Sequence, residues 1–272
     1  MSLNFSNNKS QIMGVLNITP DSFYDGGKYT KLNNIMFRVD QMIAEGMDII
    51  DIGGESSRPG SVRISIQEEI DRLLPVVSKI RENHDIPISI DSTKPDVILK
   101  LLPYKIDIIN DISSISDERF INIIKENNTH ICLMHMLDNP ETMQNNPNYT
   151  SVVGTVKSYL EDRVNFCLSH GISMDKIIID PGFGFGKTLD HNYELLNHLE
   201  EFTAISQNIL IGISRKSMIG NLLNKNTSDR LNGSIASAVI AILNSAKIIR
   251  THDVRQTKIA VHLAENIIRD EA

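Results

Sequence analysis

The stretch "IIIDPGFGFGKT", residues 177–188, decides the fold because it holds a strand, a turn and the approach to a helix in one short segment. Its three isoleucines are β-branched. A short apolar run that ends in a polar residue is typical of a strand buried on both faces, as in a parallel sheet. The glycines after Pro181 give the backbone a tight path out of the strand. We therefore interpret the stretch as a buried strand and a loop that leads into a helix.

The ending Gly-Lys-Thr also occurs in the phosphate-binding P-loop, and spacing tests this alternative. A P-loop has another glycine five positions before the glycine of Gly-Lys-Thr. Counting back from Gly186, that position holds Pro181, which has no backbone N–H to offer a phosphate. The spacing argues against a nucleotide cradle. We expect Lys187 to be a solvated surface residue outside the site.

Seven further apolar runs resemble this strand, and helical patterns separate them. The expected strands are 11–17, 47–53, 87–91, 107–112, 130–136, 176–182, 209–214 and 246–252. Ser65 and Glu68 have the spacing of a capping box, which indicates that a helix starts there. The other expected helices are 31–45, 95–103, 117–127, 151–170, 190–200, 229–244 and 253–269.

Eight strands that alternate with eight helices in 272 residues have the count and size of a (β/α)8 TIM barrel, an α/β fold. A doubly wound open sheet is the alternative. It calls for a glycine fingerprint after the first strand, and "LNITPDSF" (16–23) is not one. No linker-like or repetitive segment interrupts the series, so we expect a single barrel domain over residues 1–272.

The composition argues against several classes of partner. The net charge is −7, the pI is about 5.6 and no long basic cluster occurs, so neither nucleic acid nor an anionic membrane is expected as a partner. The polar N-terminus lacks the apolar core of a signal peptide, and no apolar run approaches the roughly 20 residues that span a bilayer. Cys132 and Cys167 have no metal-type spacing and are expected as buried thiols in a reducing compartment. We expect a cytoplasmic protein that acts on small molecules.

A polar residue stands at the end of every expected strand. The carboxyl ends of the strands meet at one face of a barrel, and barrel enzymes place their sites there. The residues are Asn17, Asp51, Asp91, Asn110, Asp111, His135, Asp180, Ser214, Arg215, Lys216, Arg250 and His252. Helix capping explains one aspartate after a strand, but it is a poor explanation for all eight ends. We therefore expect a site at this face.

The gathered groups indicate the kind of ligand. Carboxylates and amides suit a flat heterocycle that carries its own donors and acceptors. Arg58, Arg63, Arg250 and His252 suit a phosphate or pyrophosphate. The residues alone predict a site for a polar ring and an anion, and their spacing does not name the ring.

Eight motifs, taken together, resemble the dihydropteroate synthase family of the folate pathway. They are "MGVLNITPDSFYDGG" (13–27), "DIGGESSRPGS" (51–61), "SIDSTKP" (89–95), "INDIS" (109–113), "LMHM" (133–136), "DPGFGFGKT" (180–188), "GISRKSMIG" (212–220) and "RTHDV" (250–254). The family's fold is a (β/α)8 barrel, in agreement with the strand count. The resemblance implies an enzyme that joins 6-hydroxymethyl-7,8-dihydropterin pyrophosphate to p-aminobenzoate and releases pyrophosphate.

The resemblance also implies a pterin pocket. The carboxylate of Asp180 would accept hydrogen bonds from the pterin 2-amino group and ring N–H together. Lys216 would donate to the oxygen side of the ring, and the planar guanidinium of Arg250 would lie on the ring face. The other implied pterin contacts are Asp91, Asn110 and Met134.

For the leaving pyrophosphate, the resemblance implies an anion clamp of Arg58, Arg250 and His252. Asn17 would be a ligand of Mg²⁺, the implied cofactor, because an amide oxygen suits a hard cation. Catalysis would then be mostly electrostatic. The implied catalytic residues are Asn17, Asp91, Lys216, Arg250 and His252.

The p-aminobenzoate pocket resembles that of the family in Phe23, Ser57, Pro59, Phe185 and Ser217. Ser217 would open the helix after the seventh strand, where free N–H groups stabilise a carboxylate. A homodimer is also implied by the resemblance.

Two alternatives stay open. One is a pterin methyltransferase that serves a corrinoid, which would not need Arg58 or the "SRKS" motif (214–217) found here. The other is a non-catalytic pterin-binding homologue, which would be expected to have lost some of the catalytic residues named above. None of them is missing.

Overall fold

A computed structural model describes residues 3, 9–18, 28–56, 61–138 and 142–269 of the chain. Eight strands form one parallel sheet, in the order β6-β5-β4-β3-β2-β1-β8-β7. A parallel bridge between Ile179 and Ile209 joins its two edges and closes the barrel. The strands are β1 (Gln11–Asn17), β2 (Ile49–Gly53), β3 (Ile88–Asp91), β4 (Ile108–Asp111), β5 (His130–Met134), β6 (Ile177–Asp180), β7 (Leu210–Ile211) and β8 (Ile248–Thr251).

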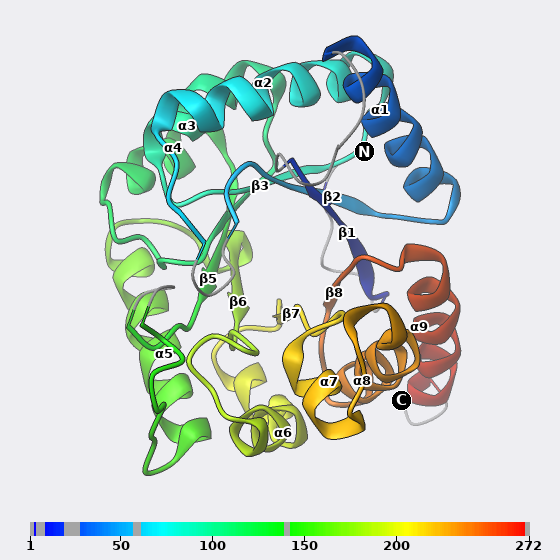
Figure 1. Cartoon of the computed structure of the whole chain (residues 1–272). Helices are drawn as coiled ribbons and strands as arrows, with labels where there is room; N and C mark the ends of the chain where they lie inside the picture. The colour runs from blue at the N-terminus through cyan, green and yellow to red at the C-terminus, as the bar shows by residue number, and fades with distance from the viewer. Residues whose placement is uncertain (1–2, 4–8, 19–27, 57–60, 139–141, 270–272) are drawn as a thin grey trace.

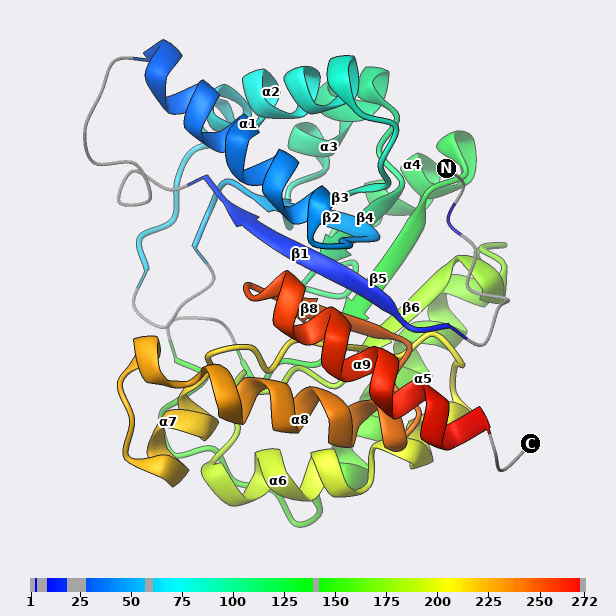
Figure 2. The same ribbon diagram turned by 90° about the vertical axis from the view of Figure 1, so that its right-hand side faces the viewer.

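The helices form a ring around the strands (Figure 1). They are α1 (Lys28–Ala44), α2 (Ile66–Asn83), α3 (Pro95–Leu101), α4 (Arg119–Asn127), α5 (Val152–Ser169), α6 (Leu189–Asn197), α7 (Ser217–Leu223), α8 (Leu231–Leu243) and α9 (Val254–Arg269). Short 3-10 turns are η2 (Leu102–Tyr104), η3 (Met174–Lys176), η4 (Leu199–Ala204) and η5 (Thr227–Asp229). In Figure 2, α8 and α9 lie side by side.

The TIM barrel is thus confirmed. The first strand has the expected bounds, and each of the other seven is found but is one to four residues shorter in total than expected. The short helix α7 adds one element to the expected helical series, and Ser217 does open it. Helix α2 runs on to Asn83 and contains Pro75. Pro75 lies on the exposed side of that helix, where water can satisfy the carbonyl that its missing N–H leaves unpaired.

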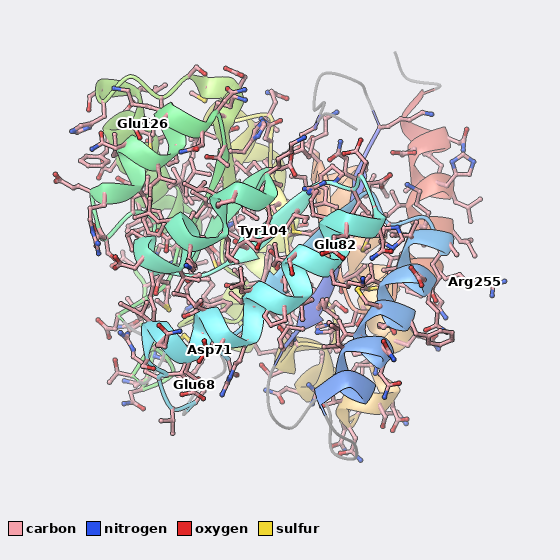
Figure 3. All side chains as sticks on the ribbon, turned by 90° about the horizontal axis from the view of Figure 1, so that it is seen from above. Glu68, Asp71, Glu82, Tyr104, Glu126 and Arg255 are labelled. Atoms are coloured by element: carbon pink, nitrogen blue, oxygen red, sulfur yellow. The ribbon has the colours of Figure 1, made fainter. Side chains whose placement is uncertain are left out.

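Helix α2 shows how the ring faces solvent. The Ser65 side chain caps it by accepting from the backbone N–H of Glu68, as the sequence predicts. Its outer surface carries Glu68, Asp71 and Glu82, which Figure 3 shows projecting from the helix. Within the described parts of the chain, every helix is too short or too polar to cross a lipid bilayer.

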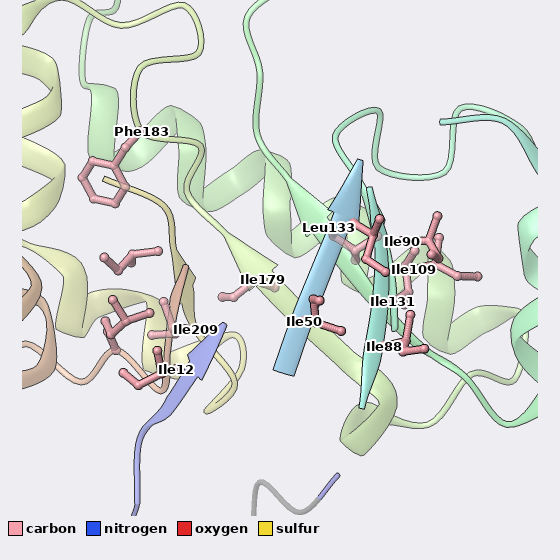
Figure 4. Close-up of a cluster of buried hydrophobic side chains, with 14 of the residues drawn as sticks. Ile12, Ile50, Ile88, Ile90, Ile109, Ile131, Leu133, Ile179, Phe183 and Ile209 are labelled. Atoms are coloured by element: carbon pink, nitrogen blue, oxygen red, sulfur yellow. The ribbon is translucent and has the colours of Figure 1, made fainter. Parts of the chain in front are cut away.

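Alternation along the strands separates two apolar layers. The interior of the barrel holds the cluster Met13, Ile49, Ile108, Cys132, Ile178, Leu210 and Ile248. Their sequence neighbours, such as Ile12, Ile50 and Ile109, belong to the larger core that packs against the helices (Figure 4). Because side chains alternate along a strand, the residues two positions after the inner cluster face inward again. In β2, β4, β6 and β8 these residues are polar.

Candidate active site

The polar inward residues lie at the carboxyl ends of the strands, as the sequence predicts. Asp51, Asn110, Asp180 and Arg250 each follow an inner-cluster residue by two positions. Strand register sets Asp91 beside Asn110 on the neighbouring strand. The first three of these residues are at most 7% exposed. The alternation that builds the apolar interior therefore also builds a buried polar layer above it.

Asp51 is the centre of this layer. Its carboxylate accepts from Ser89 Oγ at 2.6 Å and from Arg250 Nε at 2.7 Å. The amide nitrogen of Asn110 lies 3.4 Å from both Asp51 oxygens. Ser89, Arg250 and Asn110 come from three different strands, so one fully buried carboxylate orients groups across the barrel mouth.

Arg250 also bridges to Asp91, donating from Nη2 to Oδ2 at 2.9 Å. Burial raises the pKa of Asp91 to about 7, while the Arg250 cation opposes this shift and the Asp51 carboxylate adds to it. Burial acts to lower the pKa of Arg250, but Asp51 and Asp91 together raise it above its ordinary value. Arg250 is therefore a permanent cation with a fixed guanidinium plane, suited to an anion or a ring face.

Asp180 and Lys216 form the other side of the site. Asp180 Oδ1 accepts from the Gly182 N–H at 2.7 Å. Burial raises the pKa of Asp180, and the charge of Lys216 opposes the rise. Burial lowers the pKa of Lys216 to about 8, against the attraction of Asp180. The two groups are partners of opposite charge in a site with little solvent, where electrostatic interactions are strong.

The loop 181–187 covers Lys216. The Lys216 ammonium donates to the carbonyl of Phe183 and lies 4.5 Å from the centre of the Phe185 ring. Phe185 is half-buried, so its ring can wall a ligand beside Lys216. This loop contains the glycine turn seen in the sequence, with positive φ at Gly182, Gly184 and Gly186.

The expectation for Lys187 is wrong. It is 4% exposed, and its ammonium donates into the loop and to His135 instead of to solvent. The Lys187 side chain was expected on the solvent-exposed surface, because burying an isolated charge costs free energy. Burial lowers the pKa of Lys187 well below its usual range and the charge of Lys216 adds to this shift, while the Asp180 charge opposes it. The backbone carbonyls of Gly182 and Phe185 accept hydrogen bonds from the amino group in place of water.

His252 and Ser217 lie at the edge of the mouth. Ser214 Oγ accepts from the backbone N–H of His252 at 3.2 Å and also contacts its Nδ1 at 3.2 Å. Arg215 donates two hydrogen bonds to Asp253, of 2.9 and 2.6 Å, and so stabilises the loop before α7. Ser217 is exposed at the first position of α7.

A cavity of about 330 Å³ opens next to Asp91. Arg63 and two carboxylates, Glu55 and Glu69, line it together with Met136 and Tyr159. Lys94 donates to both Glu55 and Glu69. The cavity places solvent-accessible space directly beside the buried polar layer.

Among the described residues, few side chains suited to a metal gather at this mouth. No group of three or more His, Cys, Asp or Glu side chains suited to a metal occurs among residues 3, 9–18, 28–56, 61–138 and 142–269. Asn17, at the end of β1, and Asp91 both have a carbonyl or carboxylate oxygen beside Gly53. This donor set fits Mg²⁺, which binds proteins through one or two oxygen ligands and takes the rest from phosphates and water.

The sequence-predicted site residues fall into two groups. The structure brings Asp91, Asn110, Asp180, Lys216 and Arg250 together, with Asn17, Met134, Phe185, Ser217 and His252 on the adjoining strand ends and loops. Phe23, Ser57, Arg58 and Pro59 lie outside the described residues. Sequence reasoning gave no role to Asp51, although its position at a strand end was the available signal.

A closed parallel barrel with charged, buried groups at the carboxyl ends of its strands defines the class of TIM-barrel enzymes. Residues 13–252 match the model of the pterin-binding enzyme family. Over 254 residues the chain is 46% identical to dihydropteroate synthase of Escherichia coli (strain K12), covering 93% of this chain and 90% of that one. The chain belongs to the pterin-binding enzymes, and within them to the dihydropteroate synthases.

Solved structures agree. The chain resembles a Yersinia pestis dihydropteroate synthase in complex with a sulfonamide drug, with a TM-score of 0.91 and 40% identity over 98% of this chain and 96% of that chain. It also resembles a Xanthomonas albilineans dihydropteroate synthase with 4-aminobenzoic acid, with a TM-score of 0.90 and 32% identity over 98% and 95% of the two chains.

Proposed function

We propose that the chain condenses 6-hydroxymethyl-7,8-dihydropterin pyrophosphate with p-aminobenzoate, giving 7,8-dihydropteroate and pyrophosphate in folate biosynthesis. One observation carries the assignment of roles. A single polar layer holds a buried carboxylate beside a lysine, Asp180 and Lys216, together with an arginine fixed by two aspartates. That layer offers acceptors for a ring with paired donors and a cation for an anionic leaving group.

The pterin lies between these groups. One lone pair of the Asp180 carboxylate accepts a hydrogen bond from the Gly182 N–H. A carboxylate has about four lone pairs, so Asp180 can still accept hydrogen bonds from the pterin 2-amino group and ring N–H. Asp91 and Asn110 take further ring donors and acceptors, and Lys216 donates to the ring oxygen. Met134 is buried on the inward face of β5 and packs beneath the ring. The guanidinium of Arg250 stacks on the ring.

Arg250 and His252 hold the pyrophosphate, joined by Arg58. Asn17 would hold Mg²⁺, and the Asp91 carboxylate lies near the Asn17 side chain beside Gly53. When bound, the ion supplies charge neutralisation on the leaving pyrophosphate.

The p-aminobenzoate lies at the outer edge of the mouth. The half-buried ring of Phe185 covers one side of it, and Ser217 meets its carboxylate at the first turn of α7. Phe23, Ser57 and Pro59 complete the pocket. The solved relative that contains 4-aminobenzoic acid supports this choice of substrate.

The protein's part in the reaction is electrostatic. As the bond from the exocyclic carbon to pyrophosphate breaks, positive charge develops on the pterin and is shared by its ring. The catalytic residues Asn17, Asp91, Lys216, Arg250 and His252 fix this environment and balance the leaving charge. No general base is needed before attack, because the arylamine of p-aminobenzoate is neutral at pH 7.

The working unit we propose is a homodimer of this single barrel domain, residues 1–272, in the cytoplasm. Helices α7, α8 and α9 expose an apolar surface made of Leu222, Ile240, Leu243, Ile259, Leu263 and Ile267, which are 44 to 64% exposed. We call it the C-terminal apolar surface. Free, buried Cys132 and Cys167 suit a reducing compartment.

Product analysis tests the reaction. Purified chain, Mg²⁺ and both substrates should give 7,8-dihydropteroate, identified by its mass after chromatography. Omission of either substrate should abolish the product. Tight pterin binding with no product under saturating p-aminobenzoate would contradict the proposal and indicate a binding protein.

A further inference from the structure

Lys187 is a buried cation to which the proposed reaction assigns no role. Three acceptors surround its Nζ at normal hydrogen-bond distance: Gly182 O at 2.8 Å, Phe185 O at 3.0 Å and His135 Nδ1 at 3.0 Å. A fourth, His135 O, is more distant at 3.4 Å. With His135 Nδ1 as an acceptor, the three close contacts take three N–H donors, which a lysine side chain has only as the ammonium. This geometry favours the charged form, although burial lowers the pKa of Lys187.

The histidine partner is suited to accept. Burial, together with the charge of Lys187, lowers the pKa of His135 to about 3. The imidazole is therefore neutral at pH 7, and its Nδ1 can take a hydrogen bond from the ammonium. The edge of the Tyr159 ring lies against the imidazole, with ring centres 5.1 Å apart, which fixes its orientation. The ammonium thus joins loop 181–187 to a rigid side chain after β5.

The same ammonium also closes the loop on itself. Gly182 and Phe185 are three residues apart, and their carbonyls both point to Nζ. The Phe185 N–H in turn donates to the Gly182 carbonyl at 3.1 Å, so this carbonyl accepts twice. Positive φ values of 72° at Gly182 and 81° at Gly184 turn the chain so that these carbonyls converge. Without the Lys187 amino group, the Gly182 carbonyl would keep only the Phe185 N–H as a donor, and the Phe185 carbonyl would lose the donor described here.

The loop is in direct contact with both ends of the Asp180–Lys216 pair. The Gly182 N–H donates to Asp180 Oδ1 at 2.7 Å. The Phe183 carbonyl accepts from Lys216, and the Phe185 ring lies 4.5 Å beneath the same ammonium. Any change in the loop path therefore moves the carboxylate, the lysine and the aromatic wall together.

We propose that Lys187 is a positioning residue, whose ammonium holds loop 181–187 in the conformation that sets Asp180, Lys216 and Phe185 for the substrates. The inference rests on the proposed function, since it concerns the same pocket. Lys187 touches no substrate, because its three protons are all used within the protein. Its role is to give the Phe185 carbonyl a donor and the Gly182 carbonyl a second one, because proteins avoid leaving buried acceptors unpaired.

The test compares Lys187→Met with Lys176→Met. Methionine keeps the length and apolar stem of the side chain but removes the donors. Lys176 is a matched control, because its ammonium also donates to a backbone carbonyl, Asn128 O at 3.1 Å, at the opposite end of β6. Calorimetry with 6-hydroxymethyl-7,8-dihydropterin, which carries no pyrophosphate and cannot react, measures the pocket without turnover. Steady-state rates then give KM for p-aminobenzoate and kcat.

For Lys187→Met we expect the Kd for the pterin and the KM for p-aminobenzoate each to rise about tenfold or more. A rise of this size corresponds to the loss of one to two hydrogen bonds from a charged group. Lys176→Met should leave both constants within about twofold of the parent chain. In Lys187→Ala, millimolar propylammonium should restore part of the pterin affinity, and it should restore none in Asp180→Asn. A merely structural lysine would lower Tm without changing either constant, and that result overturns the proposal.

If Lys187→Met does not fold, His135→Ala carries the test, since it removes one acceptor and keeps the cation. It should raise the pterin Kd by about threefold or more, and an unchanged Kd would overturn the proposal. Failure of the proposed function is a separate result: the unaltered chain itself would then bind no pterin and form no dihydropteroate.

Discussion

At the scale of single residues, the site depends on charges that the barrel keeps away from water. Asp51, fully buried, accepts hydrogen bonds from residues 38, 59 and 199 positions away in the sequence. No local pattern reveals such a set, which is why the sequence located Asp51 at a strand end and gave it no role. The same limit explains the wrong expectation for Lys187, whose partners become acceptors only when the loop turns. Asp91, Asn110, Asp180 and Arg250 were located by their positions at strand ends, and the resemblance supplied the roles that spacing alone could not.

Asp180→Asn should weaken binding of 6-hydroxymethyl-7,8-dihydropterin by about a hundredfold, since an amide can accept with one atom only and loses the charge. Calorimetry measures the effect. Asp190→Asn is the control, because Asp190 is an exposed carboxylate in the first turn of α6. Equal affinity in the Asp180 variant and the parent chain would remove Asp180 from the pterin pocket.

The pH dependence of activity should follow the protonation state of Lys216. Burial lowers its pKa to about 8, so the ammonium is present below that pH and is lost as pH rises through it. We therefore expect kcat/KM for the pterin substrate to fall above about pH 8, since this ratio reports the free enzyme. In Lys216→Met the rate should be lower at every pH and this alkaline fall should vanish. An alkaline fall that persists in the variant would assign the titration to another group.

At the scale of elements, the strands were predictable and the loops were not. Apolar β-branched runs located all eight strands, and their alternation explains why the residues after the apolar interior are polar and inward. The ends of β7 and the short helix α7 were less clear, because Leu210–Ile211 and Ser217–Leu223 are too short to show a period. The glycines of loop 181–187 were correctly assigned to a turn, but the internal hydrogen bonds that shape it depend on tertiary packing.

Gly182→Ala tests that loop. Gly182 has a φ of 72°, and a Cβ there would lie 1.9 Å from the carbonyl oxygen of His135. The backbone cannot yield without moving β5 or the loop, so the free energy of unfolding should fall by about 2–4 kcal/mol. Denaturant unfolding measures the change. Gly154→Ala, at an exposed position in α5, should stay within about 1 kcal/mol of the parent chain. A loss no larger at Gly182 than at Gly154 would contradict the packing described for the loop.

At the scale of the whole molecule, the barrel explains why residues from position 17 to position 252 can share one site. The order of strands and helices could be predicted from the sequence, because each strand–helix unit repeats an apolar run followed by a helical pattern. The oligomeric state could not be predicted in this way, because exposed apolar residues on a helix do not identify the partner that packs against them. The six exposed apolar residues of the C-terminal apolar surface nonetheless lead to a prediction about the homodimer.

Leu263→Asp should shift the chain toward a monomer, since it places a charge at the most exposed residue of the C-terminal apolar surface. Leu263 is 64% exposed, so the fold itself should tolerate the change. Sedimentation velocity over a range of concentrations measures the assembly. Leu99→Asp on α3 is the control, because Leu99 is 47% exposed on a helix outside that surface. Identical sedimentation of both variants and the parent chain would exclude this surface as the dimer contact.

The most direct test of the central claim is the rate of pyrophosphate release from 6-hydroxymethyl-7,8-dihydropterin pyrophosphate with Mg²⁺, measured with and without p-aminobenzoate. We predict that release depends on p-aminobenzoate and matches dihydropteroate formation mole for mole. Asp180→Asn should abolish most of it at low substrate. No release, or release that p-aminobenzoate does not affect, would contradict the claim that this pocket performs the condensation.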